Sequence, residues 1–541
     1  MRAPRIVAVW VVALAGAAVA CGAEGSTLGS GASEDASPSG APGAGGGSGA
    51  LLPGGGAAGS PLPPEREIEQ RYQAPVASKR FVWVANPTSG RVAFVDAATA
   101  EVSLVEAGNS PTTVAALPGA DDAAIVLNAL SKDATVMRVG AEGIATRRVA
   151  VPSGGNAWAV SPSGARAIAW TNAKLLEHAD PLDGYQDVTV VDLSQGAEKS
   201  VTLSVGYRPT RVAFGADAAR AFVVSQDGVS VIDLSGEPRV ASNVRLTDPG
   251  KSLDADDVVV SPDGARAIAR RPGEKGVAVV DLASGALAVV SLASAPTDVE
   301  LSSDGTTALV VLRETGEVAW VPLPGAIGDP NLVVKKKIAD TGQTIGSVVV
   351  ARTGARAFLY SSAVPEARMS VITPGDPAQA PMHLLLRAPV GGVFSSDDGA
   401  SALVLHDKPP TPMSGAPATS YVAAFSLALT TTGAPPKVQG LDAKPVAAVI
   451  SPGGDRALVA TGAGTSGPFR AYLARLPSLS IETFELPSAP ISAGLVPAAG
   501  KAFIAEQHPE GRLSLIDLEG GAIKTITGFE LAAKVVYGGA K

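Results

Sequence analysis

The sequence is poor in the residues that build most catalytic and metal sites. Its 541 residues include one cysteine and four histidines. A single cysteine excludes intramolecular disulfides and every metal or cluster site that needs several cysteines. The histidines (His178, His383, His406 and His508) stand far apart, with no pair at metal-ligand spacing. The sequence also lacks a Gly-x-Ser-x-Gly elbow, a phosphate loop and a haem-attachment motif, so it predicts no catalytic residue, no metal and no cofactor.

Basic and aromatic residues are scarce as well. Acidic side chains outnumber basic ones by 51 to 43, which gives a net charge of -8, and aromatic residues make up 4% of the chain. Nucleic-acid binding depends on clustered Lys and Arg, and single strands also need stacked aromatic rings. We interpret the only triple-basic run, Lys335-Lys336-Lys337, as a solvated face. We therefore expect no nucleic-acid partner.

The N-terminus has the pattern of an export signal. Arg2 and Arg5 precede an apolar stretch from Ile6 to Ala20, and Cys21 follows directly. A charged start, a short apolar segment and small residues at the cut are typical of signal peptides. The stretch is shorter than the roughly 20 apolar residues of a spanning helix. We expect residues 1–20 to be removed.

The position of the single cysteine points to an acylated protein. The segment resembles a bacterial lipoprotein signal, although Ala18 stands where that family usually has a larger aliphatic residue. The resemblance implies acylation of Cys21 and anchoring in a membrane of the bacterial cell envelope. Gly22, in place of Asp, would permit transfer to the outer membrane, with the protein facing the periplasm or the surface. Ordinary secretion with a spare thiol is the alternative.

The residues after the cysteine predict a flexible tether. Of the 43 residues from Gly22 to Pro64, 35 are Gly, Ala, Ser or Pro. Such a segment has too few large apolar side chains to offset its ordering entropy. As a flexible coil it would span on the order of 35–40 Å. We therefore divide the chain into a signal (1–20), a lipidated tether (21–65) and a folded part (66–541).

The folded part repeats one pattern. A Ser-Pro-x-Gly turn followed by a short apolar strand occurs at Ser161 and Ser261 and, in altered form, at several other places. Valine-rich strands that end in Ile-Asp or Val-Asp, and prolines at strand starts, complete the pattern. Equivalent positions recur every 41 to 55 residues, at Phe81, Ala124, Ala167, Ala221, Ala267, Ala308, Ala357, Ala402, Ala457 and Ala502.

These motifs resemble YVTN-type β-propeller repeats. The resemblance implies an all-β fold of about ten four-stranded blades, in one large closed ring or in two rings. We expect the first unit to start at its second strand, Arg80 to Val84, and the last unit to end on an unpaired first-type strand, Ala533 to Tyr537. We predict that these two segments pair and close a single ring.

Insertions gather on one predicted rim. Most long loops join second to third strands, and the Thr247–Asp257 insertion joins two blades, whereas Pro324–Asn331 falls on the opposite rim. Insertions on one face of a repeat fold often mark the binding face; neutral drift is the alternative. The candidate binding residues on this rim are Glu177, His178, Asp180, Asp183, Asp187, His406 and His508. The carboxylates do not have the spacing of an EF-hand, so we expect an acidic loop rather than a calcium site.

Together these features predict a non-catalytic binding or scaffold protein of the cell envelope. Acylated Cys21 would hold it at the membrane, and the loop-rich rim would bind a protein or an envelope polymer. The alternative is a hydrolase resembling the propeller-fold lactonases, which open a small ester in the central channel. The sequence does not match their active residues one by one.

Overall fold

The computed structural model describes residues 75–119, 122–141, 143–151, 154–176, 178–248, 250–253, 257–271, 273–339, 342–411, 420–462, 467–476, 478–508, 510–529 and 534–535. The predicted signal, Cys21 and the predicted tether lie outside the described residues. None of the helices in the described part is long and apolar enough to cross a bilayer.

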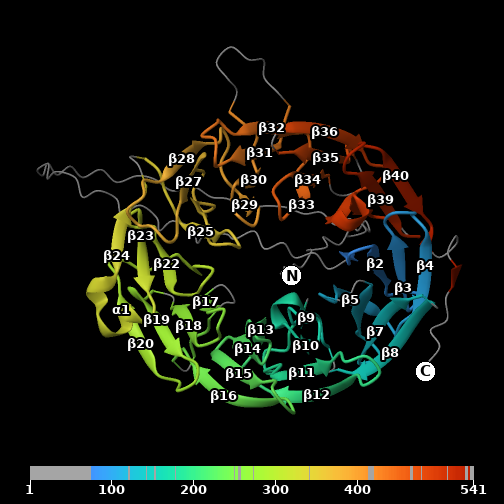
Figure 1. Ribbon diagram of the computed structural model, residues 1–541, viewed down its shortest axis with the longest axis horizontal. Coiled ribbons are helices and arrows are strands. Elements are labelled where there is room, and N and C mark those ends of the chain that lie inside the picture. Colours follow the sequence, from blue (N-terminus) through green and yellow to red (C-terminus); the bar gives the residue numbers. More distant parts are fainter. Residues whose placement is uncertain are drawn as a thin grey trace, which may run out of the picture.

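Ten blades stand around one ring, each with four antiparallel strands of which the first lies at the centre and the fourth at the outer wall (Figure 1). The strands of blades one to five are β1 (Val76–Ala77), β2 (Phe81–Asn86), β3 (Arg91–Asp96), β4 (Val102–Glu106), β5 (Pro111–Ala116), β6 (Ala123–Asn128), β7 (Asp133–Gly140), β8 (Gly143–Ala150), β9 (Ala157–Val160), β10 (Arg166–Trp170), β11 (Asp187–Asp192), β12 (Lys199–Ser204), β13 (Pro209–Phe214), β14 (Arg220–Ser225), β15 (Gly228–Asp233), β16 (Arg239–Arg245), β17 (Val258–Val260), β18 (Arg266–Arg270), β19 (Gly276–Asp281) and β20 (Leu287–Ser291).

The strands of blades six to ten are β21 (Asp298–Leu301), β22 (Thr307–Leu312), β23 (Glu317–Pro322), β24 (Val334–Lys337), β25 (Ser347–Val350), β26 (Ala357–Tyr360), β27 (Arg368–Ile372), β28 (Met382–Leu385), β29 (Gly392–Ser395), β30 (Ser401–His406), β31 (Ala423–Leu429), β32 (Lys437–Leu441), β33 (Pro445–Ile450), β34 (Arg456–Thr461), β35 (Arg470–Arg475), β36 (Ser480–Glu485), β37 (Pro490–Val496), β38 (Lys501–Glu506), β39 (Arg512–Asp517) and β40 (Ile523–Thr527). Among the helical turns that the structure describes in full, η1 (Ala173–Leu175), α1 (Gly325–Gly328) with η3 (Pro330–Leu332), and η4 (Pro497–Ala499) interrupt three connections. All ten repeat positions marked in the sequence fall in second strands, which confirms the ten-unit count.

The ring closes by packing between the first and last blades. Ten buried apolar clusters each join two neighbouring blades, and one of them joins blade ten to blade one. In that cluster Phe503 and Leu515 of blade ten meet Val82 and Val95 of blade one. Because every interface between neighbouring blades is filled, the ten units form one ring rather than two.

The predicted closing pair is wrong. Blade one has its own first strand, β1, whose Val76 pairs with Trp83 of β2. The C-terminal strand β41 (Lys534–Val535) instead pairs in parallel with β4, at the outer wall of blade one. The two-residue β1 already occupies the inner edge of β2, so the last strand adds to the only edge of this sheet that remains.

The Ser-Pro-Asp-Gly turn shows why the repeat needs these residues. Ser261 Oγ donates to Asp263 Oδ1 at 2.6 Å and accepts from the Arg266 N–H at 2.9 Å. Gly264 has a φ of +63°, and a Cβ there would lie 2.3 Å from the Phe222 ring of the preceding blade. The turn therefore joins the first strand to the second and also seats one blade against the next.

Candidate functional site

The long loops share one rim of the ring. Because the strands of a blade alternate in direction, second-to-third loops and blade-to-blade connections leave at the same rim, and the tight first-to-second turns leave at the other. The loop-rich rim carries the connections 171–186, 247–257, 361–367, 407–422, 462–469 and 507–511. The predicted placement of these insertions is confirmed, as is that of Pro324–Asn331, which lies between β23 and β24 at the opposite, plain rim.

The 171–186 loop of blade three is held by its own aspartates. Asp180 Oδ1 accepts from the Leu182 N–H, and Asp183 Oδ1 accepts from the Tyr185 N–H, each at 2.8 Å. The Tyr185 hydroxyl in turn accepts from the Asp180 N–H at 2.8 Å. These two carboxylates therefore serve as turn formers, a common use of Asp in loops.

Arg208, in the connection from blade three to blade four, supports this loop from beside it. Its guanidinium donates to the carbonyl oxygens of Asp180 and Asp183, at 2.8 and 3.2 Å. It also lies 6.0 Å from the ring centre of Tyr185 and 5.2 Å from that of Tyr207. A fixed arginine between two tyrosines has the composition of binding hot spots, which are enriched in Tyr and Arg.

The loop carries an exposed apolar side chain at its tip. Leu182 is 92% exposed, although the backbone around it is held by the hydrogen bonds of Asp180 and Arg208. His178 and Asp187 are exposed as well, whereas Glu177 lies outside the described residues. His178 and Asp187 are therefore accessible, and the structure adds Leu182, Tyr207 and Arg208, which charge patterns alone do not reveal.

His406 is wrong as a rim residue. It ends β30 with its side chain fully buried, Nδ1 lying 2.9 Å from Pro389 O and Nε2 2.7 Å from Ser426 Oγ. Burial is the main reason why the pKa of His406 falls to about 4, so the imidazole is neutral at pH 7. A neutral, enclosed histidine cannot contact a partner at the rim.

The His406–Ser426 contact is one version of a buried pattern shared between blades. Asn128 donates to Thr135 at 2.9 Å in blade two, and Ser514 donates to Glu506 in blade ten, where the polar residues again end second strands. Buried hydroxyls recur on the third strands of six blades: Thr135, Thr189, Ser230, Ser370, Ser426 and Ser514. A repeated internal hydrogen bond is a structural feature, so His406 and Ser426 are not a nucleophile and its base.

His508 lies in the 507–511 loop of blade ten. Its Nδ1 accepts from the Glu510 N–H at 3.2 Å, and the side chain is half-buried. Blade ten is three positions around the ring from blade three, so His508 and His178 belong to separate parts of the rim. Across the described residues, no three His, Cys, Asp or Glu side chains come together as a metal-binding group.

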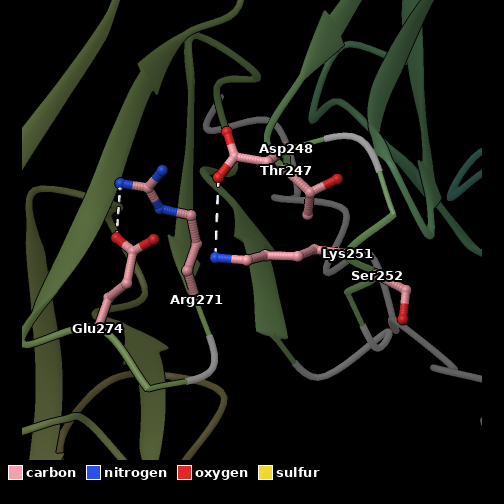
Figure 2. Close-up of a pocket in the computed structure, with 6 residues that line it drawn as sticks. All are labelled: Thr247, Asp248, Lys251, Ser252, Arg271 and Glu274. Atoms are coloured by element: carbon pink, nitrogen blue, oxygen red, sulfur yellow. Dashed lines mark ion pairs between the residues drawn. The ribbon is translucent and has the colours of Figure 1, made fainter.

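A polar hollow of about 240 Å³ opens where the 247–257 connection meets blade five. Lys251 and Asp248 form an ion pair at 3.7 Å, and Arg271 and Glu274 form another at 2.8 Å (Figure 2). Thr247 Oγ1 is buried there without a hydrogen-bond partner among the described residues. Because cations and anions both line it, the hollow could hold a small anionic or a small cationic group. Sequence reasoning marked the insertion but not Arg271 and Glu274, which come from the adjacent β18–β19 loop.

Buried and partly buried ionisable groups near the centre of the ring join blades five, six and seven. Asp298 accepts from the Val348 N–H of the next blade at 2.7 Å and from the Val299 N–H at 2.8 Å. Burial, reinforced by the charge of Glu300, raises the pKa of Asp298 well above its usual range. Arg270 of blade five pairs with Asp257 at 2.9 Å and donates to the Thr297 carbonyl of blade six. These groups therefore hold neighbouring blades together.

No known family model matches this sequence, and no curated protein matches it. Similar solved structures include a eukaryotic initiation factor, at 10% identity over 83% of this chain and 97% of that chain, with a TM-score of 0.49. Another is the dihydro-heme d1 dehydrogenase NirN in complex with DHE, at 15% identity over 67% and 78% of the two chains, with a TM-score of 0.40. Hydrazine synthase of Kuenenia stuttgartiensis is 18% identical over 59% and 98%, with a TM-score of 0.30. Likeness at this identity concerns the fold alone.

Proposed function

We propose that this protein is a lipid-anchored propeller of the bacterial cell envelope that binds a protein or an envelope polymer through its loop-rich rim, without catalysis. One observation carries the proposal: the insertions project from one rim, while the other rim consists mainly of tight turns. Loops on a rigid ring can differ in sequence without disturbing the blades, and binding residues concentrate in such positions.

The blade-three loop (residues 171–186) combines an exposed apolar side chain with a backbone that hydrogen bonds hold in place. Leu182 and Tyr207 supply exposed apolar surface, and the Arg208 guanidinium fixes the loop that presents Leu182. A preformed loop loses less conformational entropy on binding than a floppy one, which increases affinity. The acidic side chains of Asp180, Asp183 and Asp187 favour a partner segment with basic groups beside an apolar anchor.

The anchor half of the proposal depends on Cys21 and the segment that precedes it. Several acyl chains on one cysteine would hold the chain at a membrane far better than a single chain could. The Cys21→Ala variant should move from the membrane fraction to the soluble fraction when cells are broken and separated. Retention of this variant in the membrane fraction at the level of the unchanged protein would contradict acylation as the anchor.

Site-specific photocrosslinking tests the rim. A photoreactive residue at position 182 should yield a crosslinked product in intact cells, and one at position 237, in the β15–β16 turn of the plain rim, should not. Replacing Arg208 with alanine should weaken the product at 182, because it frees the loop. Equal yields of crosslinked product at positions 182 and 237 would contradict binding through the loop-rich rim.

The hydrolase alternative gains no support from the described residues. The Ser370–His383 and Ser426–His406 contacts each have a fully buried serine, which a substrate could not reach. The buried carboxylate Asp298 is occupied by two backbone N–H groups. Binding through the rim is therefore the function that the geometry supports best.

A further inference from the structure

Over seven of the ten blades, the outer wall of the ring has a charge opposite to that of the whole protein. The chain carries a net charge of -8. Yet the fourth strands of blades two to eight, β8, β12, β16, β20, β24, β28 and β32, contain no Asp or Glu along their described lengths and several Lys and Arg. Cations on edge strands protect sheets from pairing with other chains, so the charge alone requires no partner.

The outer walls of blades five and six also expose apolar side chains, as does that of blade seven through Leu385 on β28. Leu287 and Val289 on β20, and Ile327 and Leu332 on the β23–β24 connection, are between 39% and 48% exposed. Edge protection would favour polar groups at these positions, since exposed apolar edges promote aggregation. Exposed apolar clusters on a soluble domain mark interaction sites.

The β23–β24 connection is built to present its apolar residues outward. It forms α1 and η3, and α1 packs against β20 and β23 at the outside of the ring (Figure 1). Ala326 is buried in the cluster between blades five and six, which fixes α1 to the wall. Asp329, the one acidic residue of this connection, caps η3 by accepting from the Asn331 N–H at 3.0 Å. Ile327 and Leu332 are therefore held at the surface by their buried neighbour.

The triple-lysine run lies directly after this connection and divides between two faces of β24. Lys336 turns toward blade seven, where its Nζ donates to the carbonyls of Pro377, Ala378 and Gln379 at 2.7 to 3.2 Å. Lys335 and Lys337 alternate to the other face of the strand and are exposed. The interpretation of the run as a solvated face thus holds for two lysines, while Lys336 is structural.

We infer that the surface between β20 and β24, made of Ile327, Leu332, Lys335 and Lys337 and here called the β20–β24 face, rests on an anionic phospholipid bilayer. Leu287 and Val289 lie on the other side of β20, toward blade four, and are not part of this face. Apolar side chains that enter the headgroup region beside lysines that attract lipid phosphates are the chemistry of interfacial binding. The face offers a partner cations and apolar groups, and its one carboxylate already caps a helix. Because this face combines cations with exposed apolar side chains, binding through it also sets the orientation of the ring.

This inference rests on the proposed lipid anchor, which would bring the ring within reach of a membrane, but its test does not need the anchor. The chain from residue 21 onward with Cys21→Ala carries no acyl group. It should float with vesicles of phosphatidylglycerol and phosphatidylethanolamine and stay behind with vesicles of phosphatidylcholine alone. Added salt should weaken the binding, because surface charge is screened.

Variants of the face separate its two components. Each lysine near an anionic surface is worth about a five-fold change in partitioning, so Lys335→Glu with Lys337→Glu should lower partitioning roughly 25-fold or more. Replacing Ile327 and Leu332 with asparagine should lower it as well, without altering the salt dependence. Lys335→Glu alone should lower partitioning at least about five-fold. Its matched control is Arg147→Glu, which makes the same change in charge at an exposed cation on β8 and should bind normally.

Three results would overturn the inference. They are failure of the unacylated chain to bind phosphatidylglycerol vesicles, equal losses for Arg147→Glu and Lys335→Glu, and unchanged binding by the asparagine variant. Unchanged vesicle binding by all variants would place the membrane contact elsewhere on the ring and refute the inference. Unfolding curves matching those of the parent chain exclude misfolding as the cause of a loss. Fractionation of the Cys21→Ala variant in cells reports on the anchor separately, so the two failures are distinguishable.

Discussion

When the pH is lowered to mildly acidic values, the His406→Gln variant should lose less stability than the parent protein does. In the parent protein Nδ1 lies 2.9 Å from the Pro389 carbonyl, which can only accept, so Nδ1 carries the hydrogen and donates it. Nε2 must then accept from the Ser426 hydroxyl, 2.7 Å away. A second proton on the ring would break this arrangement inside a closed core, in keeping with a pKa that burial lowers to about 4 from its ordinary 6.5.

The magnitude follows from proton linkage. Between the two pKa values the unfolded chain binds a proton that the folded protein does not, so stability falls as the pH falls through this window. From about pH 7 to about pH 5, one such histidine costs about 2 kcal/mol. The glutamine variant should already be less stable at neutral pH, by about 1–3 kcal/mol, because the buried hydrogen bonds are disturbed. It should lack the further loss that comes from the imidazole.

Urea unfolding of both proteins at the two pH values measures this difference. All other titrating groups are shared, so they cancel when the acid-induced loss of the variant is subtracted from that of the parent. His178→Gln, which changes an exposed histidine, should lose as much stability in acid as the parent does. The reasoning is refuted if His406→Gln and the parent lose equal stability, since His406 would then titrate normally and would not be enclosed.

Three further predictions concern the frame of the ring. Gly264→Ala should cost more than about 2 kcal/mol because its Cβ would lie 2.3 Å from the Phe222 ring, whereas Gly196→Ala, also at positive φ but with open space, should cost about 1 kcal/mol; urea unfolding compares them. Phe503→Ala should lower the free energy of unfolding by about 3–5 kcal/mol, because packing between blades ten and one closes the ring. Removal of residues 530–541, which include β41, should lower it by only about 1 kcal/mol. A larger effect of the truncation than of Phe503→Ala would contradict closure by packing. Asp298→Ala should lower the free energy of unfolding by about 1–3 kcal/mol. Because the pKa of Asp298 is raised in the folded state, the parent protein should lose stability as the pH rises above the ordinary carboxyl range, and the variant should lack this loss. Identical dependence of stability on pH in both proteins would contradict the burial of Asp298.

The repeat could be predicted from sequence because its determinants are local. The Ser-Pro-Asp-Gly turn needs only neighbouring residues, and it marks the boundary of the first and second strands wherever it occurs. The closing strand could not be placed in the same way. Two-residue strands such as β1 and β41 carry little pattern, and their partners are set by contacts between distant parts of the chain.

The candidate site was predictable in part, for similar reasons. Loop length assigned Asp180 and Asp183 to the correct rim, but their use as turn formers depends on hydrogen bonds within the loop. His406 stands at the end of a second strand, where blades two and ten have Asn128 and Glu506, each bonded to a hydroxyl on the third strand. Comparing the repeats at that position would have identified His406 as an internal residue.

The outer wall shows what sequence reasoning misses most completely. In the sequence, Lys335-Lys336-Lys337 is a uniform basic run. In the structure, side chains alternate along the strand, so Lys336 bonds to the next blade while its two neighbours are exposed. The exposure of Ile327 and Leu332 depends on how Ala326 docks α1, which no local pattern reveals. The β20–β24 face therefore emerges only from the packed ring.

Capture from detergent-solubilised native envelope tests whether the loop-rich rim binds a partner. The baits are the chain with its rim intact, a copy in which residues 174–185 are replaced by a tight turn, and a plain-rim control with Glu237→Ser and Pro238→Ser. The account predicts a partner that the intact bait and the plain-rim control both retain and that the shortened bait loses. A partner retained equally by all three, or by none of them, would contradict binding through the loop-rich rim.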